Sequence, residues 1–238
     1  KKILYKNIYN MADKIIVNSE DFKKELKFKF NVNSECIYNP LNKKEIIKNS
    51  KKKININFFK KKDFKIISVA RFTDQKDHLC LVRSINLLKN KYKNIKVLLI
   101  GSGNKKNEIK NLIDELGLKK IIKILNFKKN PYPYIKKSDL FILSSNFEGL
   151  PNVLLEAITL KKFVISSNCP TGPSEILDNG KGGLLFKVGN YKELSKKIIY
   201  TIHNKKKCDK KLLFAKRRLE RFDFSKNLLK YNNILNTI

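Results

Sequence analysis

The sequence predicts an α/β fold, a doubly wound parallel sheet accompanied by a remnant of a second α/β unit. Short apolar runs such as "FKIISVA" and "KVLLIG" are continuous, as expected for strands buried on both faces. Segments with helical periodicity separate these runs, so strands and helices alternate along the chain. Glycines and polar side chains follow several of the runs, where open parallel sheets bind their ligands.

Residues 1–40 form the remnant. The stretch "YNMADKIIVNSEDFKKELKFKF" predicts the end of a helix, a strand at Lys14–Asn18, and a helix capped by Ser19 with an acidic first turn. "SECIYNPLN" predicts a second strand and a proline turn. One strand-helix-strand unit cannot cover its own apolar faces, so its sheet neighbours are missing. Since the chain begins Lys-Lys and its only methionine is Met11, we expect it to start partway through a longer protein.

The remaining chain divides into three parts. Residues 41–63 are rich in Lys and Asn and are predicted to be a linker with a short helix, residues 64–205 form the main α/β domain, and residues 206–238 form amphipathic helices. Helices are predicted between the strands, one of them closed by Gly117. The predicted strands lie at 64–70, 96–101, 122–127, 139–145 and 162–168, with a shorter one in "GGLLFKV".

The composition is strongly basic. The 238 residues carry a formal net charge of +32, and 42% of them are hydrophobic, which suits a packed core. Such a charge attracts phosphates, nucleic acid or anionic lipid headgroups, although the even scatter of lysines also fits a general bias of composition. The sequence contains no recognisable nucleic-acid-binding motif or aromatic stacking platform, which disfavours a nucleic-acid partner.

The cysteines and the apolar runs bear on the cellular compartment. Four widely spaced cysteines without a Cys-x-x-Cys pair argue against a zinc site or a disulfide framework and favour a reducing compartment. No apolar run approaches the roughly 20 residues of a membrane span, and no signal peptide is visible. We therefore expect a cytoplasmic protein.

Two predicted strand ends carry candidate phosphate-binding groups. "RFTDQKD" places Arg71 and Lys76 after the first strand of the main domain, where a guanidinium and an ammonium could hold a diphosphate, although both could be ordinary solvated cations. Gly101 and Gly103 follow the next strand and would let backbone approach a ligand, but they fit a tight turn equally well. Lys106 replaces the third glycine of a dinucleotide-binding fingerprint, which excludes that motif.

The stretch "SNFEGLPNVLLEAI" places two carboxylates around the start of a predicted helix. Pro151 suits the first helical position, and Glu148 lies in the loop before it. Asn152, Glu156 and Thr159 are predicted to share the polar side of the helix. Either glutamate could be a helix-dipole or surface residue. Together, at a ligand-binding edge, they suit the vicinal hydroxyls of a sugar, because each carboxylate can accept two hydrogen bonds.

A fourth candidate loop, "NCPTGPSEIL", follows the predicted strand at 162–168 and contains two prolines and Gly172, then Ser174 and Glu175. Its exposed backbone N–H groups could line the same cleft, or it could be an ordinary connection.

These motifs resemble a known family. "VARFTDQKDHLCLV", "GSGNKKNEI", "FEGLPNVLLEA" and "CPTGPSEIL…GGLLF" together look like the nucleotide-sugar-binding half of a family 4 glycosyltransferase. Such enzymes are retaining and have two facing Rossmann-like domains, the GT-B fold. The resemblance covers about residues 64–205, and residues 1–40 resemble the end of the N-terminal, acceptor-binding domain.

The resemblance assigns roles to particular residues. Arg71 and Lys76 would hold and neutralise the donor diphosphate, and Glu148 would face the donor sugar; these are the predicted catalytic residues. Glu156 would accept from the ribose hydroxyls, and Phe127 lies where the family's backbone contacts the base. Neither histidine matches a catalytic position. The full set of predicted donor-binding residues is Gly101, Gly103, Phe127, Gly149, Leu150, Pro151, Asn152 and Glu156.

The implied function is transfer of a hexose or N-acetylhexosamine from a UDP-sugar to a lipid-linked or polysaccharide acceptor in bacterial surface glycan synthesis. Because no Asp-x-Asp motif occurs, no metal cofactor is expected. The basic surface suggests peripheral contact with the inner face of the cell membrane. The alternative is a non-catalytic nucleotide-sugar-binding fragment that lacks the acceptor domain.

Overall fold

The computed structural model describes residues 8, 9 and 11–237 of the chain. Ile8 and Tyr9 are helical and Met11 lies in a turn, in agreement with the helix end predicted at the start. Its centre is a six-stranded parallel sheet with the strand order β5-β4-β3-β6-β7-β8. In chain order this is 3-2-1-4-5-6, the strand order of a doubly wound sheet. The prediction of a parallel α/β fold is confirmed.

Each predicted strand is present within a few residues of its expected bounds. The continuous apolar runs are buried because helices cover both faces of the sheet, and the strands end where polar residues or glycines begin. The strands of the sheet are β3 (Phe64–Val69), β4 (Ile95–Ile100), β5 (Ile122–Leu125), β6 (Leu140–Leu143), β7 (Phe163–Ser167) and β8 (Leu184–Phe186).

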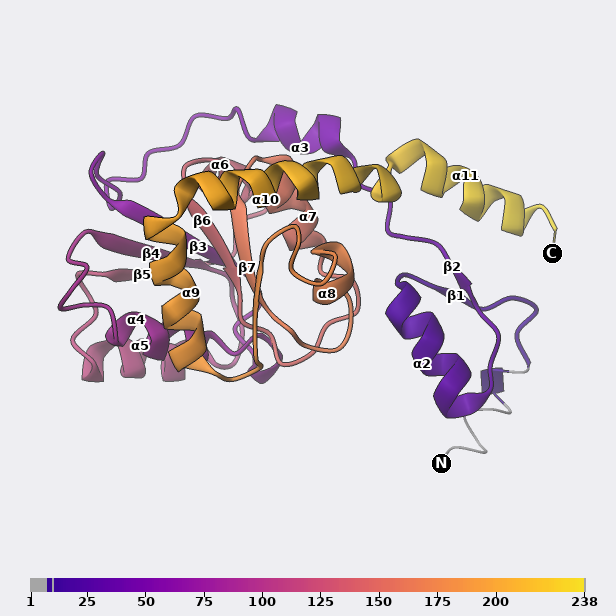
Figure 1. Cartoon of the computed structure of the whole chain (residues 1–238), viewed down its shortest axis with the longest axis horizontal. Helices are drawn as coiled ribbons and strands as arrows, with labels where there is room; N and C mark the ends of the chain where they lie inside the picture. Colours follow the sequence, from indigo (N-terminus) through magenta and orange to yellow (C-terminus); the bar gives the residue numbers. More distant parts are fainter. Residues whose placement is uncertain (1–7, 10, 238) are drawn as a thin grey trace.

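Helical segments connect these strands and continue to the C-terminal end of the chain (Figure 1). Those before and between the strands are α3 (Lys43–Asn49), the 3-10 turn η1 (Asp74–Lys76), α4 (His78–Asn86), α5 (Lys106–Glu115), α6 (Tyr132–Lys136), α7 (Asn152–Thr159) and α8 (Pro173–Ile176). Those after the sheet are α9 (Tyr191–His203), α10 (Lys205–Arg218), the 3-10 turn η2 (Leu219–Phe222) and α11 (Phe224–Leu235).

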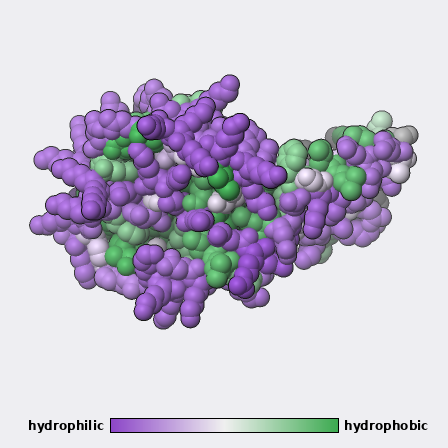
Figure 2. Space-filling view, turned by 90° about the horizontal axis from the view of Figure 1, so that it is seen from above, coloured by the Kyte–Doolittle hydropathy of each residue, from purple (hydrophilic) through white to green (hydrophobic). Residues whose placement is uncertain are grey.

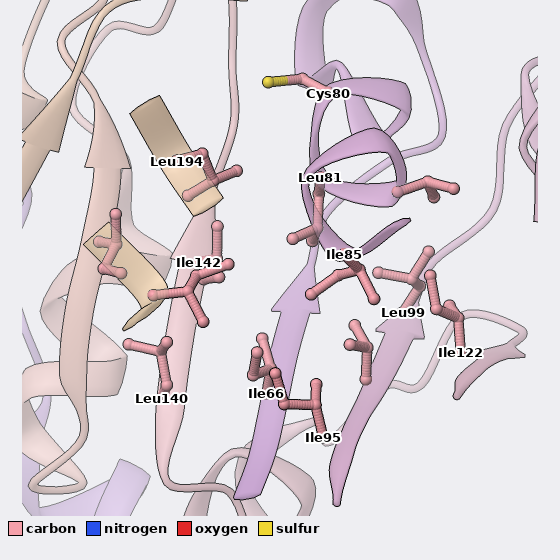
Figure 3. Close-up of a cluster of buried hydrophobic side chains, with 14 of the residues drawn as sticks. Ile66, Cys80, Leu81, Ile85, Ile95, Leu99, Ile122, Leu140, Ile142 and Leu194 are labelled. Carbon is pink, nitrogen blue, oxygen red and sulfur yellow. The ribbon is translucent and has the colours of Figure 1, made fainter. Parts of the chain in front are cut away.

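The sheet separates two apolar layers. One layer packs α4, α5 and α9 onto the sheet; Figure 3 shows Leu81 and Ile85 of α4 directed at the strands that carry Ile66 and Leu99. The other layer packs α3, α6, α7 and α10 onto the opposite face. Ile46 of α3 is buried in this second layer, so the segment predicted as a linker lies on the main domain.

The remnant of a second α/β unit is a small strand-helix-strand unit at one end of the molecule. Strands β1 (Ile16–Val17) and β2 (Glu35–Cys36) pair in parallel, and α2 (Glu20–Phe30) connects them. In Figure 1 this unit lies to the right of the main domain, beneath α11. The chain crosses between the two parts twice, and the crossings touch where Leu41 forms a bridge with Asp223 and Tyr38 packs on Phe222 with ring centroids 4.7 Å apart.

Local sequence explains the ends of several helices. The Ser19 side chain accepts a hydrogen bond from the Phe22 N–H at 3.1 Å, as predicted for the cap of α2. Gly117 ends α5 in the left-handed conformation with φ +65°, which also confirms its predicted role. The helix predicted to start at Pro151 begins one residue later, with Pro151 as its N-cap.

Candidate functional site at the central strands

The predicted site residues lie beyond the carboxyl ends of the parallel strands. Arg71 and Lys76 follow β3, and the segment from Glu148 to Asn152 follows β6. Strands β3 and β6 are neighbours at the centre of the sheet, where the direction of strand order reverses. Such a reversal leaves a crevice between the loops of the two strands, which is where ligands bind in doubly wound sheets.

An ion pair joins the two central loops. The Lys76 Nζ lies 2.6 Å from the Glu148 Oε1, and the Ser145 hydroxyl donates to the same oxygen at 2.5 Å. The Lys76 and Glu148 side chains are only 14% and 7% exposed, so water screens their attraction weakly. Lys76 uses one of its three N–H donors on Glu148, which leaves two for a ligand.

Hydrogen bonds between the loops fix this geometry. The Gln75 side chain donates to the Phe147 carbonyl at 3.0 Å, and the Asn146 N–H donates to the Gln75 carbonyl at 2.7 Å. The Ser144 hydroxyl donates to the Lys76 carbonyl at 3.0 Å. The backbone on both sides of the ion pair is therefore held by the neighbouring loop.

A third loop supports Glu148 from the side of β7. The Glu148 N–H donates to the Pro170 carbonyl at 2.7 Å, and the Thr171 N–H donates back to the Glu148 carbonyl at 2.9 Å. Gly172 has φ +90°, and a Cβ there would lie 2.2 Å from the Gly149 carbonyl oxygen. Only glycine allows this approach, so the Gly-Pro loop is packed directly against the Glu148 loop.

Arg71 lies at the same edge as Lys76 but faces solvent. Its guanidinium donates to Gln75 Oε1 at 3.4 Å, a long contact that leaves the group open to a ligand. An exposed cation and a largely buried, ion-paired one thus stand on the same loop.

The two glycines after β4 have a structural explanation. A Cβ on Gly101 would lie 2.0 Å from the Ala70 carbonyl oxygen, and one on Gly103 would lie 2.3 Å from the Phe72 carbonyl oxygen. The backbone at both glycines therefore lies close to neighbouring carbonyl groups, which fits the tight turn that the sequence left open as an alternative. Contact of Gly101 and Gly103 with a ligand stays a prediction.

Phe127 is 67% exposed in the loop after β5, at the same edge of the sheet. The loop is tied to α5, because the Lys106 Nζ donates to the Asn126 side chain at 2.7 Å. The lysine that replaces the fingerprint glycine thus holds the loop next to Phe127.

Glu156 lies one turn into α7 and faces a cavity of about 180 Å³. Burial raises the pKa of its carboxyl, and the Tyr132 hydroxyl, which donates to it at 3.5 Å, opposes that shift. Burial and then Glu156 raise the pKa of Tyr132 to about 12. The polar residues lining this cavity are Asn39, Asn42, Glu45, Tyr132, Asn152 and Glu156.

The remaining residues of the predicted motif divide between core and surface. Leu150 and Pro151 are buried, whereas Gly149 is exposed, and a Cβ there would lie 3.7 Å from the Asn18 side chain. The prediction that Thr159 shares the polar side of α7 is wrong: Thr159 is 8% exposed and its hydroxyl donates to the Leu155 carbonyl. A threonine can satisfy its hydroxyl within its own helix, which permits its burial.

The two histidines lie outside the ion-paired cluster. His78 is buried against Phe72, and burial followed by the charge of Lys76 lowers the pKa of its ring to about 4. His203 contacts the Tyr92 hydroxyl through Nε2 at 2.9 Å. The described residues contain no group of three or more His, Cys, Asp or Glu side chains that could hold a metal ion. In the same part of the chain, no helix has the length and apolarity needed to cross a membrane.

Sequence reasoning missed several polar residues around the site. Ser145 and Gln75 hold the ion pair and its loops, and Tyr132 contacts Glu156. Their position just beyond strand ends was the available signal. Gln75 and Tyr132 have their partners on other segments of the chain, so local sequence did not identify these contacts, whereas Ser145 lies only three residues before Glu148.

Comparison with known proteins places this geometry in a family. The family described as glycosyl transferases group 1 matches residues 49–214, which include the central loops. An uncharacterized glycosyltransferase from Methanocaldococcus jannaschii is 37% identical over 180 residues, covering 74% of this chain and 44% of that protein. An N-acetylgalactosamine-N,N'-diacetylbacillosaminyl-diphospho-undecaprenol 4-alpha-N-acetylgalactosaminyltransferase from Campylobacter jejuni is 30% identical over 236 residues, covering 97% of this chain and 62% of that protein.

Solved structures share the fold. Anabaena HepE in complex with UDP and glucose superposes with a TM-score of 0.84 at 19% identity, covering all of this chain and 67% of that one. Staphylococcus aureus TarM gives 0.82 at 20% identity, covering 96% of this chain and 45% of that one. At these identities the likeness concerns the fold, which is that of GT-B glycosyltransferases.

The chain spans less than two thirds of the length of these two curated relatives. The matched region nevertheless contains the whole six-stranded sheet and the loops that carry the ion pair. The chain belongs to the group 1 glycosyl transferases.

Proposed function

We propose that this chain binds the donor in a retaining, family 4 glycosyltransferase that moves a hexose or N-acetylhexosamine from a UDP-sugar to a lipid-linked or polysaccharide acceptor. The observation that carries the proposal is the Lys76–Glu148 ion pair at the strand-order reversal. It offers cationic N–H donors and a carboxylate at one point in a weakly screened crevice, which suits a diphosphate joined to a sugar.

In the proposed reaction, the bond between the sugar C1 and the β-phosphate oxygen breaks, and the acceptor hydroxyl oxygen forms the new bond to C1. Negative charge grows on the departing UDP, and the acceptor hydroxyl passes its proton to a β-phosphate oxygen of that UDP. Lys76 and Arg71 stabilise this charge, because cations fixed before the reaction need little reorganisation. Glu148 accepts hydrogen bonds from the sugar hydroxyls and thereby orients C1.

The nucleotide occupies the neighbouring cavity in this proposal. Glu156 accepts from the ribose hydroxyls, with Asn152 on the turn before it and Tyr132 opposite. The base lies against the loop that carries Phe127. The backbone at Gly101, Gly103 and Gly149 leaves room for close approach, because none of these residues has a side chain. The proposed site uses no metal ion.

Names of related proteins support the choice of donor and acceptor. HepE is recorded with UDP and with UDP-glucose, and TarM with UDP. The Campylobacter jejuni relative is named as an N-acetylgalactosaminyltransferase acting on a diphospho-undecaprenol-linked sugar, and further relatives are named for capsular polysaccharide and amylovoran biosynthesis. These names favour a UDP-sugar and a glycan or lipid-linked acceptor.

Calorimetric titration of the chain with UDP and UDP-sugars tests this proposal. We expect UDP to bind, Glu156→Ala to weaken binding of UDP and UDP-sugars alike, and Glu148→Gln to remove only the increment that the sugar adds. An intact fold with no heat on addition of UDP would contradict the donor site. Binding without turnover on lipid-linked or polysaccharide acceptors would support the second candidate, a non-catalytic nucleotide-sugar-binding fragment.

We also propose peripheral contact with an anionic membrane at the cytoplasmic face. The sequence KKKCDKKLLFAKRR of α10 contains eight lysines and arginines and one aspartate, and Figure 2 shows the surface over α10 and α3 as mostly hydrophilic. Each suitably placed cation contributes about 1 kcal/mol to binding an anionic surface. Vesicle co-sedimentation that rises with the fraction of anionic lipid supports this contact, and sedimentation indifferent to lipid charge contradicts it.

A further inference from the structure

Glu175, in the short helix α8 after β7, contacts the small N-terminal unit formed by β1, α2 and β2. One carboxylate oxygen accepts from the Glu20 N–H at 3.0 Å, and the other accepts from the Asp21 N–H at 3.2 Å. Glu20 and Asp21 are the first two residues of α2, whose N–H groups have no partner within the helix. A carboxylate from the main domain thus caps a helix of the other unit.

Asp21 also faces the α8 segment. Burial and then the charge of Glu175 raise the pKa of the Asp21 carboxyl, whereas the backbone of Gly172, at the N-cap position of α8, lowers it. The first turn of α2 therefore lies against the start of α8. Ser19 supplies the third cap on α2 through its hydrogen bond to the Phe22 N–H.

The two chain crossings converge on the same residue. The Tyr38 hydroxyl, on the first crossing, donates to Glu175 Oε1 at 2.5 Å. Arg221, on the second crossing, donates to the Glu175 carbonyl at 3.1 Å. Glu175 is therefore bonded to α2 and to both segments that connect the units.

Short contacts lead from this junction to the ion pair. Gly172 packs so closely on the Gly149 carbonyl that a Cβ would lie 2.2 Å from it. Thr171 and Pro170 exchange backbone hydrogen bonds with Glu148. A rotation of the N-terminal unit that pulled on Glu175 would thus move the loop that holds Glu148.

We propose that Glu175 is a positioning residue that couples the orientation of the N-terminal unit to the geometry of the Glu148 loop. The inference rests on the proposed function for its consequence, because Glu148 is there the group that orients the donor sugar. Ligand bound at the Glu148 loop and orientation of the N-terminal unit then bias each other, as linkage requires.

Amide hydrogen exchange of the full chain, resolved by residue, tests the coupling without any ligand. Glu175→Gln keeps the size of the side chain but removes its charge and one acceptor. We expect exchange at Glu20 and Asp21 to accelerate about 10-fold or more, because hydrogen bonds to charged groups are the strong ones. Exchange at the Glu148 and Thr171 amides should accelerate as well.

Two further variants separate coupling from general damage. Glu193→Gln alters another helix-borne carboxylate, which accepts from the Lys187 N–H within the main domain, and should leave all four amides unchanged. Tyr38→Phe removes one donor to Glu175 from the side of the N-terminal unit and should produce the Glu175→Gln pattern at smaller amplitude. Unchanged exchange at Glu20 and Asp21 in Glu175→Gln would overturn the contact, and acceleration confined to those two amides would overturn the coupling.

The response of amide exchange to UDP is the second measurement. It would not depend on Glu175 if that residue had a purely structural role. In the wild-type chain and in Glu193→Gln, UDP should change exchange at Glu20 and Asp21, and in Glu175→Gln this response should be lost. UDP binding with no response at α2 in the wild-type chain would overturn the coupling. Failure of UDP to bind would contradict the proposed function, while the ligand-free exchange would still decide the role of Glu175.

Discussion

The Lys76–Glu148 ion pair should behave as an energetically coupled unit. At 2.6 Å and an effective dielectric constant of about 20, the attraction between two unit charges is about 6 kcal/mol before desolvation is subtracted. Both side chains are largely removed from water, so desolvation cancels a substantial part of this gain. We expect a net coupling free energy of about 3 kcal/mol, within the range found for close charge pairs.

A double-mutant cycle measures this coupling. Lys76→Met leaves the Glu148 carboxylate with Ser145 as its hydroxyl donor, and Glu148→Gln leaves a buried ammonium. Each single variant should lose about 3 kcal/mol of the free energy of unfolding, because an uncompensated charge remains. The double variant contains neither charge and should also lose about 3 kcal/mol, well short of the sum of about 6 kcal/mol that independent sites would give.

Urea unfolding of the four proteins, followed by circular dichroism and fluorescence, gives the free energies. Equal slopes of the unfolding free energy against urea concentration are the condition for comparing them. Additivity of the single effects within about 0.5 kcal/mol would refute the reasoning, because independent sites add to that precision. It would mean that the two charges do not depend on each other in solution.

Two further predictions test the surroundings of the pair. Burial raises the pKa of Glu156 in the folded protein, so ionisation of that carboxyl costs stability as the pH rises. Glu156→Gln should therefore raise Tm relative to wild type at pH 7.5, and the difference should shrink at pH 4. A difference in Tm that does not depend on pH would contradict this prediction. Gly172→Ala should lower the free energy of unfolding in urea by more than about 2 kcal/mol, because it combines a positive φ with a clash on the Gly149 carbonyl. Gly180→Ala has φ +86° but no atom nearer than 4.0 Å, so it should lower that free energy by about 1–2 kcal/mol. Equal costs for the two alanine variants would show that the loop yields to the added methyl group.

The fold was predictable because the strands of this sheet are buried on both faces. Continuous runs such as Phe64–Val69 and Leu140–Leu143 have few alternatives to a parallel strand covered by helices. The edge containing the site was predictable for the same reason, since all parallel strands end there. The small unit was also anticipated, because Ser19 and the acidic residues after it form a local cap signal.

Contacts between loops were less accessible to sequence reasoning. Glu148 could be placed before α7, yet its partner Lys76 lies 72 positions earlier, on the loop of another strand. Glu175 was visible only as part of a Gly-Pro loop, because its partners on α2 lie more than 150 positions away. Burial of Thr159 was missed because helical periodicity does not reveal a hydroxyl satisfied by its own helix.

The most direct test of the account is UDP binding by the wild-type chain and by variants at the central loop. Titration calorimetry at fixed ionic strength should show binding that Lys76→Met and Arg71→Ala each weaken about 10-fold or more, since each removes a charge-assisted contact to the diphosphate. Lys192→Ala, which removes an exposed lysine of α9, should bind UDP like the wild type. Equal affinities for all four proteins would contradict a diphosphate site at the β3 and β6 loops.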